Sequence, residues 1–237
     1  MTGVKQDRFK VHLKGLNMST LIIDLQYFGS VYWYKKVYKY THVEFSEYEK
    51  HRKMGFRNRL WIAGAEGRMN LSVPIVDARN EKQVYKDVRI VPGRWQTEHF
   101  RALVSCYNRS PWFEHYRDEL AALYEKPVDY LFDWNLACFE WMNEKLDLPV
   151  TVDVARLPGN GGQAPENESA PGADGVVNFT DYFHPSNSGN WLHGDENRFR
   201  YSQVFEDRVG FLPGLSILDL MFCEGLSGVK RLVGDAR

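Results

Sequence analysis

Two apolar helical faces separated by a proline constrain this fold more than any other feature of the sequence. The stretch Arg94 to Tyr116, RWQTEHFRALVSCYNRSPWFEHY, predicts one helix, a break at Ser110-Pro111 and then a second helix. Serine is a good N-cap and proline suits the first helical position, so Ser110 is expected to cap the second helix. Residues at helical spacing form one face of the first helix: His99, Ala102, Leu103, Cys106 and Tyr107.

The first member of this apolar face, His99, points inward with the core. A buried polar side chain is costly unless it is hydrogen-bonded or has a function. A helix predicted from about Val128 to Leu146 repeats the pattern, with Asn135 on its apolar face. The two polar residues could meet, line one pocket or make separate structural hydrogen bonds, and these interpretations stay open. As candidate catalytic residues we take His99, Asn135 and Tyr107.

An apolar run with β-branched residues at 20–25 predicts a buried strand near the start of the chain. Gln26 and Tyr27 follow it directly. Ligands of α/β proteins gather at the carboxyl ends of such strands, so position alone makes both residues candidates for substrate binding.

Further elements follow from local patterns: a helix at 31–40, strands at 42–45, 88–91 and 149–152, a β-hairpin at 60–75 and a C-terminal helix from Ser216 to Gly225. Ser216 is expected to cap this last helix, and Gly225 to end it. We therefore predict an α/β fold, with mixed α+β possible. A small mixed sheet with a β-hairpin would be packed by three main helices and a C-terminal closing helix.

The domain organisation is predicted from composition along the chain. Residues 1–17 are basic and weakly patterned, which favours a disordered extension. Residues 18–226 are expected to form one domain, and residues 227–237 a tail. Residues 156–178 are rich in Gly, Pro, Asn and Ala with few large apolar side chains, which predicts a flexible insert.

A cluster of cations lies between Tyr48 and Arg59 in the sequence YEKHRKMGFRNR. Arginine presents a planar fork to phosphate and carboxylate groups, so such a cluster suits an anionic ligand. Lys53, Arg57 and Arg59 are the predicted ligand-binding cations, and Asn58 between the two arginines joins them. The alternative is a solvated basic loop.

Charge and cysteine content narrow the classes of partner. The net charge of −1 argues against nucleic acid as a partner. The three cysteines are far apart and form neither a disulfide framework nor a metal motif, which favours a reducing compartment. The sequence holds no apolar run long enough for a membrane span and no signal-peptide core, so we expect a cytoplasmic protein. It identifies no cofactor and no oligomeric state.

An ordered set of short motifs resembles the WbqC-like protein family, in the branch common in Bacteroidetes-type bacteria. The similarity runs over about residues 20–226, with one large gap around 156–198. The matching pieces are Arg57-Asn58-Arg59 before the glycine-turn hairpin and Leu71-Ser72-Val73-Pro74; Trp95-Gln96 with His99; Tyr107 with Ser110-Pro111-Trp112-Phe113-Glu114-His115-Tyr116; Leu131-Phe132-Asp133-Trp134-Asn135; and Tyr201-Ser202-Gln203-Val204-Phe205 through Phe211-Leu212-Pro213 to Leu218-Asp219-Leu220.

The chain departs from the family pattern near its start. Other members carry a His-Gln pair before a Tyr-Phe/Leu-Pro stretch, whereas Leu25-Gln26 stands here and Gly29 replaces the proline. The resemblance implies a bacterial, cytosolic role near sugar or lipid-linked glycan assembly in surface polysaccharide biosynthesis. It supplies no settled reaction and no established catalytic residues.

Two functions remain open from the sequence. The first is a group-transfer enzyme that acts on a small-molecule substrate, an activated sugar or acyl donor. In it His99 is the general base, Asn135 and Tyr107 position the acceptor, and Trp95 joins the substrate-binding residues. The second is a non-catalytic partner in glycan assembly, which binds sugars or another protein through its aromatic side chains.

Overall fold

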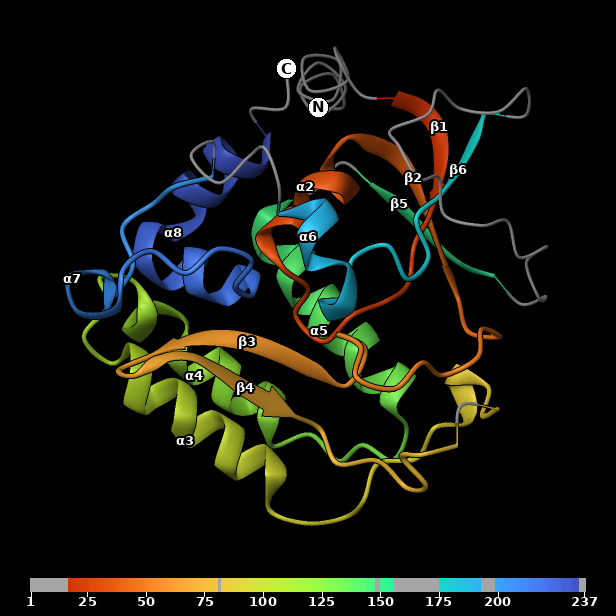
Figure 1. The fold of residues 1–237 in the computed structure, drawn as a ribbon, viewed down its shortest axis with the longest axis horizontal. Helices are drawn as coiled ribbons and strands as arrows, with labels where there is room; N and C mark the ends of the chain where they lie inside the picture. The colour runs from red at the N-terminus through yellow and green to blue at the C-terminus, as the bar shows by residue number, and fades with distance from the viewer. Residues whose placement is uncertain (1–16, 81, 148–149, 156–174, 193–198, 235–237) are drawn as a thin grey trace, which may run out of the picture.

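The computed structural model describes residues 17–80, 82–147, 150–155, 175–192 and 199–234. A four-stranded sheet lies on one side of the molecule, with helices and a separate hairpin on the other (Figure 1). Its strand order is β5-β2-β1-β6, and every pairing is parallel. The strands are β1 (Asn17–Ile22), β2 (Tyr40–Ser46), β5 (Thr151–Ala155) and β6 (Val176–Asn178).

The two central strands pair through their buried apolar residues. Leu21 of β1 lies opposite Val43 of β2 and Val177 of β6, and all three side chains are buried. Along β2, Val43 and Phe45 are fully buried, whereas His42 and Glu44 are partly exposed. This alternation fixes the register, because a slip of one residue would move the apolar side chains to the opposite face.

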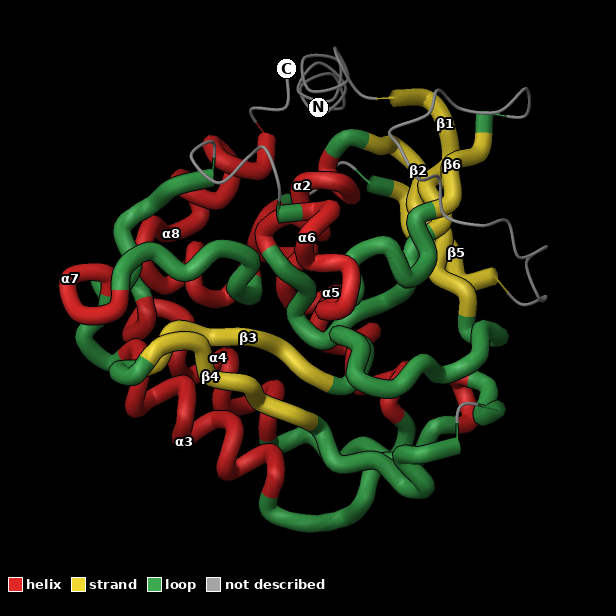
Figure 2. Tube along the Cα trace, in the orientation of Figure 1, coloured by secondary structure: helices red, strands yellow, loops and turns green. Residues whose placement is uncertain are grey.

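Some helices pack beside the sheet, and the others fill the part of the molecule farther from it (Figure 2). α2 packs against α8, α5 also contacts α8, and α3 and α4 form a neighbouring pair. α5 begins at Leu131, three residues after the predicted start. The helices are α2 (Val31–Tyr38), α3 (Trp95–Tyr107), α4 (Phe113–Tyr124), α5 (Leu131–Leu146), α6 (Ser188–Trp191), α7 (Glu206–Val209) and α8 (Ile217–Gly234), with short 3-10 helices η1 (Tyr85–Asp87) and η2 (Pro185–Asn187).

The predicted hairpin is confirmed as β3 (Arg59–Gly64) and β4 (Gly67–Ser72), which pair antiparallel. It forms a two-stranded sheet of its own. The α/β class is therefore confirmed, but the main sheet is parallel rather than mixed, because the hairpin strands do not join it.

The predicted strand at 88–91 is wrong. Its residues make only isolated bridges, Ile90 with Ile75 and Arg89 with Tyr130. Each bridge is a single residue pair, so neither neighbour offers the successive partners that a ladder needs. The cap predicted for Ser110 is also wrong, since its hydroxyl donates to the Tyr107 carbonyl (2.7 Å) and α4 begins at Phe113.

Gly225 divides the C-terminal helix instead of ending it. Its backbone has φ 68° and ψ −176°, and a Cβ there would lie 2.8 Å from the Trp112 ring, so the position requires glycine. The chain resumes helical structure to Gly234 and buries Val229 and Val233. The predicted tail at 227–237 is thus helical to residue 234. The predicted cap is confirmed, because the Ser216 hydroxyl accepts from the Leu218 amide (3.3 Å).

The predicted flexible insert lies partly within the described residues. Residues 176–178 form β6, which pairs with β1 because Val177 offers a buried apolar side chain at the register position of Leu21. Residues 156–174 lie outside the described part of the chain, as do residues 1–16 of the predicted extension. Asn17 already belongs to β1.

Candidate functional site

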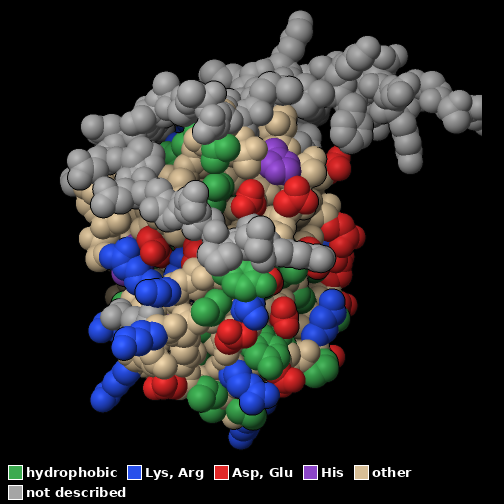
Figure 3. Space-filling model, turned by 90° about the vertical axis from the view of Figure 1, so that its right-hand side faces the viewer, with side chains coloured by type: hydrophobic (Ala, Val, Ile, Leu, Met, Phe, Trp, Pro, Cys, Tyr) green, Lys and Arg blue, Asp and Glu red, His purple; other side chains and the backbone are tan. Residues whose placement is uncertain are grey.

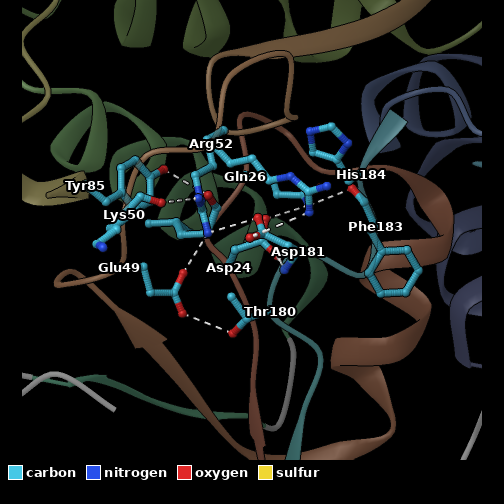
Figure 4. Close-up of polar contacts among 12 residues, drawn as sticks. Asp24, Gln26, Glu49, Lys50, Arg52, Tyr85, Thr180, Asp181, Phe183 and His184 are labelled. Carbon is cyan, nitrogen blue, oxygen red and sulfur yellow. Dashed lines mark hydrogen bonds and ion pairs between the residues drawn. The ribbon is translucent and has the colours of Figure 1, made fainter. Parts of the chain in front are cut away.

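Charged side chains meet where the parallel strands β1, β2 and β6 end. Asp24 follows β1, Glu49 follows β2 and Asp181 follows β6. Figure 4 shows these three carboxyls together, although they come from distant segments of the chain. The carboxyl ends of parallel strands lie at one edge of a sheet, which is where α/β proteins bind their ligands. We call Asp24, Gln26, Glu49, Arg57 and Asp181 the strand-end cluster.

Arg57 is the buried cation of the strand-end cluster, with a side chain only 2% exposed. Its guanidinium pairs with Glu49 Oε2 (2.7 Å) and Asp181 Oδ1 (3.2 Å). The guanidinium also donates to the Lys50 carbonyl (2.9 Å) and lies 5.2 Å from the centre of the Tyr85 ring. The sequence predicted that Arg57 binds an anionic substrate. In the structure, carboxylates of the protein itself pair with its guanidinium instead.

Burial sets the protonation of the cluster. It raises the pKa of Glu49 to about 7, although Arg57 opposes the rise. It also raises the pKa of Asp24, against the attraction of Arg57. Burial alone would lower the pKa of Arg57, but Asp181, Asp24 and Glu49 reverse the effect and raise it. The cluster therefore combines a permanent cation with a carboxyl that exchanges its proton near neutral pH.

Hydrogen bonds join the end of β1 to the segment after β6. Asp24 Oδ1 accepts from the Asp181 amide (2.9 Å). Gln26, 2% exposed, donates through Nε2 to Asp24 Oδ2 (2.9 Å) and the Phe183 carbonyl (3.1 Å). Both partners are acceptors, which fixes the orientation of the amide. Its Oε1 is buried and has no hydrogen-bond partner among the described residues.

The exposed rim of the cluster is formed by Arg52 and Lys53 of the basic loop, and the buried side chain of His184 packs beneath that loop. Arg52, 43% exposed, lies 3.9 Å from Asp181. His184 Nδ1 accepts from the Ser186 amide (3.1 Å), and its Nε2 contacts the Lys53 carbonyl (3.2 Å). Burial lowers the pKa of His184, so its imidazole is neutral beneath the loop.

Asn135 does not meet His99 but supports the strand-end cluster. Its Nδ2 donates to the Arg57 carbonyl (2.6 Å) and to the Tyr85 hydroxyl (2.5 Å). Tyr85 in turn donates to the Leu25 carbonyl (2.8 Å). Asn135 therefore holds the backbone of Arg57 and the ring beneath its guanidinium.

His99 belongs to a second buried group, with Tyr27 and Tyr124. Its Nδ1 lies 3.0 Å from the Tyr27 hydroxyl, which also bonds the Tyr124 hydroxyl. The Trp95 ring packs edge-on against the imidazole. Burial lowers the pKa of His99 to about 4, partly offset by a backbone contact at Ser72. The imidazole is therefore neutral at physiological pH.

A buried neutral histidine makes stability depend on pH. Because the pKa of His99 falls from 6.5 to about 4 on folding, its contribution is present above pH 6.5 and is lost as pH falls toward 4. We expect wild type to lose about 2 kcal/mol of unfolding free energy relative to His99→Leu between about pH 7.5 and pH 5. Urea denaturation at the two pH values measures this, and a constant difference would contradict the assignment.

Tyr107 lies in a third buried group, centred on Asp219. Its hydroxyl donates to Asp219 Oδ1 (2.6 Å) and accepts from the Ala63 amide (3.0 Å). Tyr201 and Gln203 donate to Asp219 Oδ2 at 2.6 and 3.3 Å. Burial raises the pKa of Asp219 to about 6, although all three donors lower it. This group connects α3, β3 and α8.

The structure therefore separates the predicted site residues. Gln26 and Arg57 lie in the strand-end cluster, Asn135 supports it and Lys53 is on its rim. Asn58 donates to the Val73 carbonyl (3.1 Å), and Arg59 contacts the Met54 sulfur (3.2 Å). The remaining predicted residues lie in the other two groups: Tyr27, Trp95 and His99 in one, Tyr107 in the other.

Three carboxyls of the cluster were missed from the sequence. Asp24 stands at the end of the apolar run, two residues before Gln26, and the strand-end argument could have included it. Glu49 stands at the edge of the basic stretch, where the cations dominate the pattern. Asp181 follows β6, which the sequence did not predict. His184 stands in a polar stretch without a recognisable motif, so no local pattern marked it.

Both charge signs are interspersed on the sheet side of the surface (Figure 3). Within the described residues, no group of three or more His, Cys, Asp or Glu side chains has an arrangement that could hold a metal ion. No helix of that same part of the chain has the length and apolar character needed to cross a membrane.

Comparisons with known proteins place the chain in a family. A comparison with curated proteins and one with solved structures each found no match. A sequence model of the WbqC-like protein family matches residues 25–231, which include every residue of the strand-end cluster except Asp24 and most of the domain. The chain therefore belongs to the WbqC-like protein family.

Proposed function

We propose that this protein is a bacterial, cytoplasmic group-transfer enzyme of surface polysaccharide biosynthesis, acting on an activated sugar or acyl donor. Family membership supports the setting, and the strand-end cluster supports a reaction. Its place at the carboxyl ends of β1, β2 and β6 is where α/β enzymes carry their ligands.

The observation that carries the proposal is Glu49. A general base works best when its pKa lies near the operating pH, and burial raises the pKa of Glu49 to about 7. Its two oxygens are held separately, one by Arg57 (2.7 Å) and the other by the Thr180 hydroxyl (3.0 Å). The side chain is 17% exposed, so the carboxyl is held in place and still reaches solvent.

In this proposal Glu49 takes the acid–base role that the sequence suggested for His99. Arg57 holds Glu49, and Asn135 holds Arg57 through its backbone carbonyl. Arg52 and Lys53 are exposed cations on the rim, where the phosphate or carboxylate of a donor would bind. Transfer then moves a proton from the acceptor to Glu49 while the donor is held at the rim.

Substituting Glu49→Gln is expected to lower kcat by about 100-fold or more, the usual contribution of a general base. Glutamine keeps an acceptor for Arg57 and offers a donor to Thr180, so the melting temperature should change by only a few degrees. The assay measures transfer from nucleotide sugars and acyl thioesters, with wild type identifying the active pair.

Glu47→Gln is the matched control, because it makes the same chemical change two residues away, outside the strand-end cluster. It should keep wild-type turnover. Equal activity of the Glu49→Gln variant and wild type would refute the proposal. Ligand binding without any turnover in wild type would favour the non-catalytic binding partner.

A further inference from the structure

The strand-end cluster carries more carboxyls than its buried cation can neutralise. Asp24, Glu49 and Asp181 surround Arg57, whose guanidinium forms ion pairs with Glu49 and Asp181. Arg52 approaches Asp181 at 3.9 Å but is 43% exposed and screened by solvent. The proton that Glu49 retains near neutral pH offsets this excess of negative charge. A bound cation would offset it equally well.

A second observation, independent of charge, is the unpartnered oxygen of Gln26. This side chain is 2% exposed, and its Nε2 is bonded to Asp24, so the amide is part of the cluster (Figure 4). Its Oε1 is buried without a hydrogen-bond partner among the described residues. An unpaired buried carbonyl is destabilising, and only a hydrogen-bond donor relieves that cost.

Surplus carboxylate and an unpaired carbonyl together select a ligand that is cationic and donates hydrogen bonds. A primary ammonium has both properties, with three donors and a compact charge. A neutral hydroxyl offers one donor and brings no charge to replace the proton on Glu49. A phosphate brings the wrong sign.

We infer that the acceptor substrate of the strand-end cluster carries a primary amine, as in an amino sugar. Asp181 and Gln26 Oε1 receive the ammonium, and Glu49, which pairs with the same Arg57 guanidinium as Asp181, takes its proton. This inference rests on the proposed group transfer and names the class of acceptor for it.

The transfer balances with the groups already named. Glu49 removes one proton from the ammonium, which frees the nitrogen lone pair. This pair forms the new bond to the activated carbon of the donor, and the bond to the leaving group breaks with its electrons on that group. The second proton passes from nitrogen to the leaving group, and Glu49 releases its proton to solvent.

Binding of glucosamine, with glucose as the neutral probe of the same shape, tests the inference without turnover. We expect millimolar glucosamine to raise the melting temperature at about pH 7, and glucose to leave it unchanged. Binding should weaken several-fold at about pH 6, because Glu49 then keeps its proton more fully while the probe remains charged. Asp24, Arg57, Asp181 and Thr180 are the groups that face Glu49 there.

Asp181→Asn is the decisive variant. Asp181 has φ 57°, and asparagine tolerates this left-handed backbone, so the fold is retained while the charge is removed. We expect at least tenfold weaker glucosamine binding. Asp77→Asn makes the same change at another left-handed aspartate, φ 52°, outside the cluster, and should bind as wild type does.

Equal binding of glucose and glucosamine, or no glucosamine binding at high millimolar concentration, would overturn the amine inference. Glucosamine binding unaffected by Asp181→Asn would overturn it as well. These results would not refute the proposed group transfer, because the Glu49→Gln assay tests it and does not depend on the class of acceptor. Conversely, if glucosamine binds and the Glu49→Gln variant keeps wild-type turnover, the role of Glu49 as general base is refuted and the amine-binding site is supported.

Discussion

Replacing Arg57 by methionine is expected to lower the free energy of unfolding by about 3–5 kcal/mol, the usual cost of removing one partner from a buried ion pair. Methionine fills similar space but leaves Asp24, Glu49 and Asp181 facing one another without the guanidinium. Removing the cation also raises the pKa values of these carboxyls further, because Arg57 lowers those of Glu49 and Asp24 in the native protein.

The pH dependence identifies the cause of this loss. Carboxyls whose pKa is raised by folding bind more protons in the native state, so stability increases as pH falls through their pKa values. The deficit of Arg57→Met should therefore shrink between about pH 7.5 and pH 5 in urea denaturation. Arg59→Met is the control, since the Arg59 guanidinium contacts the Met54 sulfur rather than a carboxylate among the described residues, and it should cost less than about 1 kcal/mol. A deficit independent of pH would show lost packing instead.

Asp219→Ala is expected to destabilise the fold by about 3 kcal/mol, taking roughly 1–3 kcal/mol for each buried donor left unpaired. The carboxyl receives Tyr107 from α3, and Tyr201 and Gln203 from the segment before α7. Loss of the carboxyl removes the hydrogen bonds that join α8 to α3 and to the segment before α7. Thermal and urea unfolding measure the effect.

Asp219→Asn separates the hydrogen bonds from the charge. The amide oxygen still accepts from Tyr107, so the loss should be smaller than with alanine. Because folding raises the pKa of Asp219 from 3.8 to about 6, its stabilising contribution is largest below pH 3.8 and falls as pH rises through 6. The difference in unfolding free energy between wild type and Asp219→Asn should therefore be largest at low pH and should shrink as pH rises through 6. Asp207→Ala, on the exposed side of α7, is the control and should be near neutral.

Local patterns in the sequence predicted which polar residues are buried. His99 and Asn135 were identified as inward-facing from helical spacing, and both are buried. Their partners were not predicted, because a periodic pattern locates a side chain on one element and carries no information about the remote segment packed against it. Tyr27 comes to His99 from the end of β1, and Tyr85 comes to Asn135 from η1.

The partners of the basic stretch at the candidate site could not be predicted from the sequence either. Its cations suggested an anion-binding surface, and the structure pairs Arg57 with the protein's own carboxyls instead. Asp181 reaches Arg57 only because β6 joins β1, and that strand lay inside a segment whose composition predicted flexibility. The strand has only three residues, two valines and Asn178, which is too short a run to be recognised.

The sequence by itself determined the main helices, the hairpin and their buried faces, because the periodic burial of apolar side chains is a local property of the chain. It also determined family membership, through an ordered set of motifs. Only the tertiary structure decided the chemistry of the strand-end cluster. The protonation of Glu49 and the unpaired oxygen of Gln26 depend on burial and on charges that folding brings from distant loops.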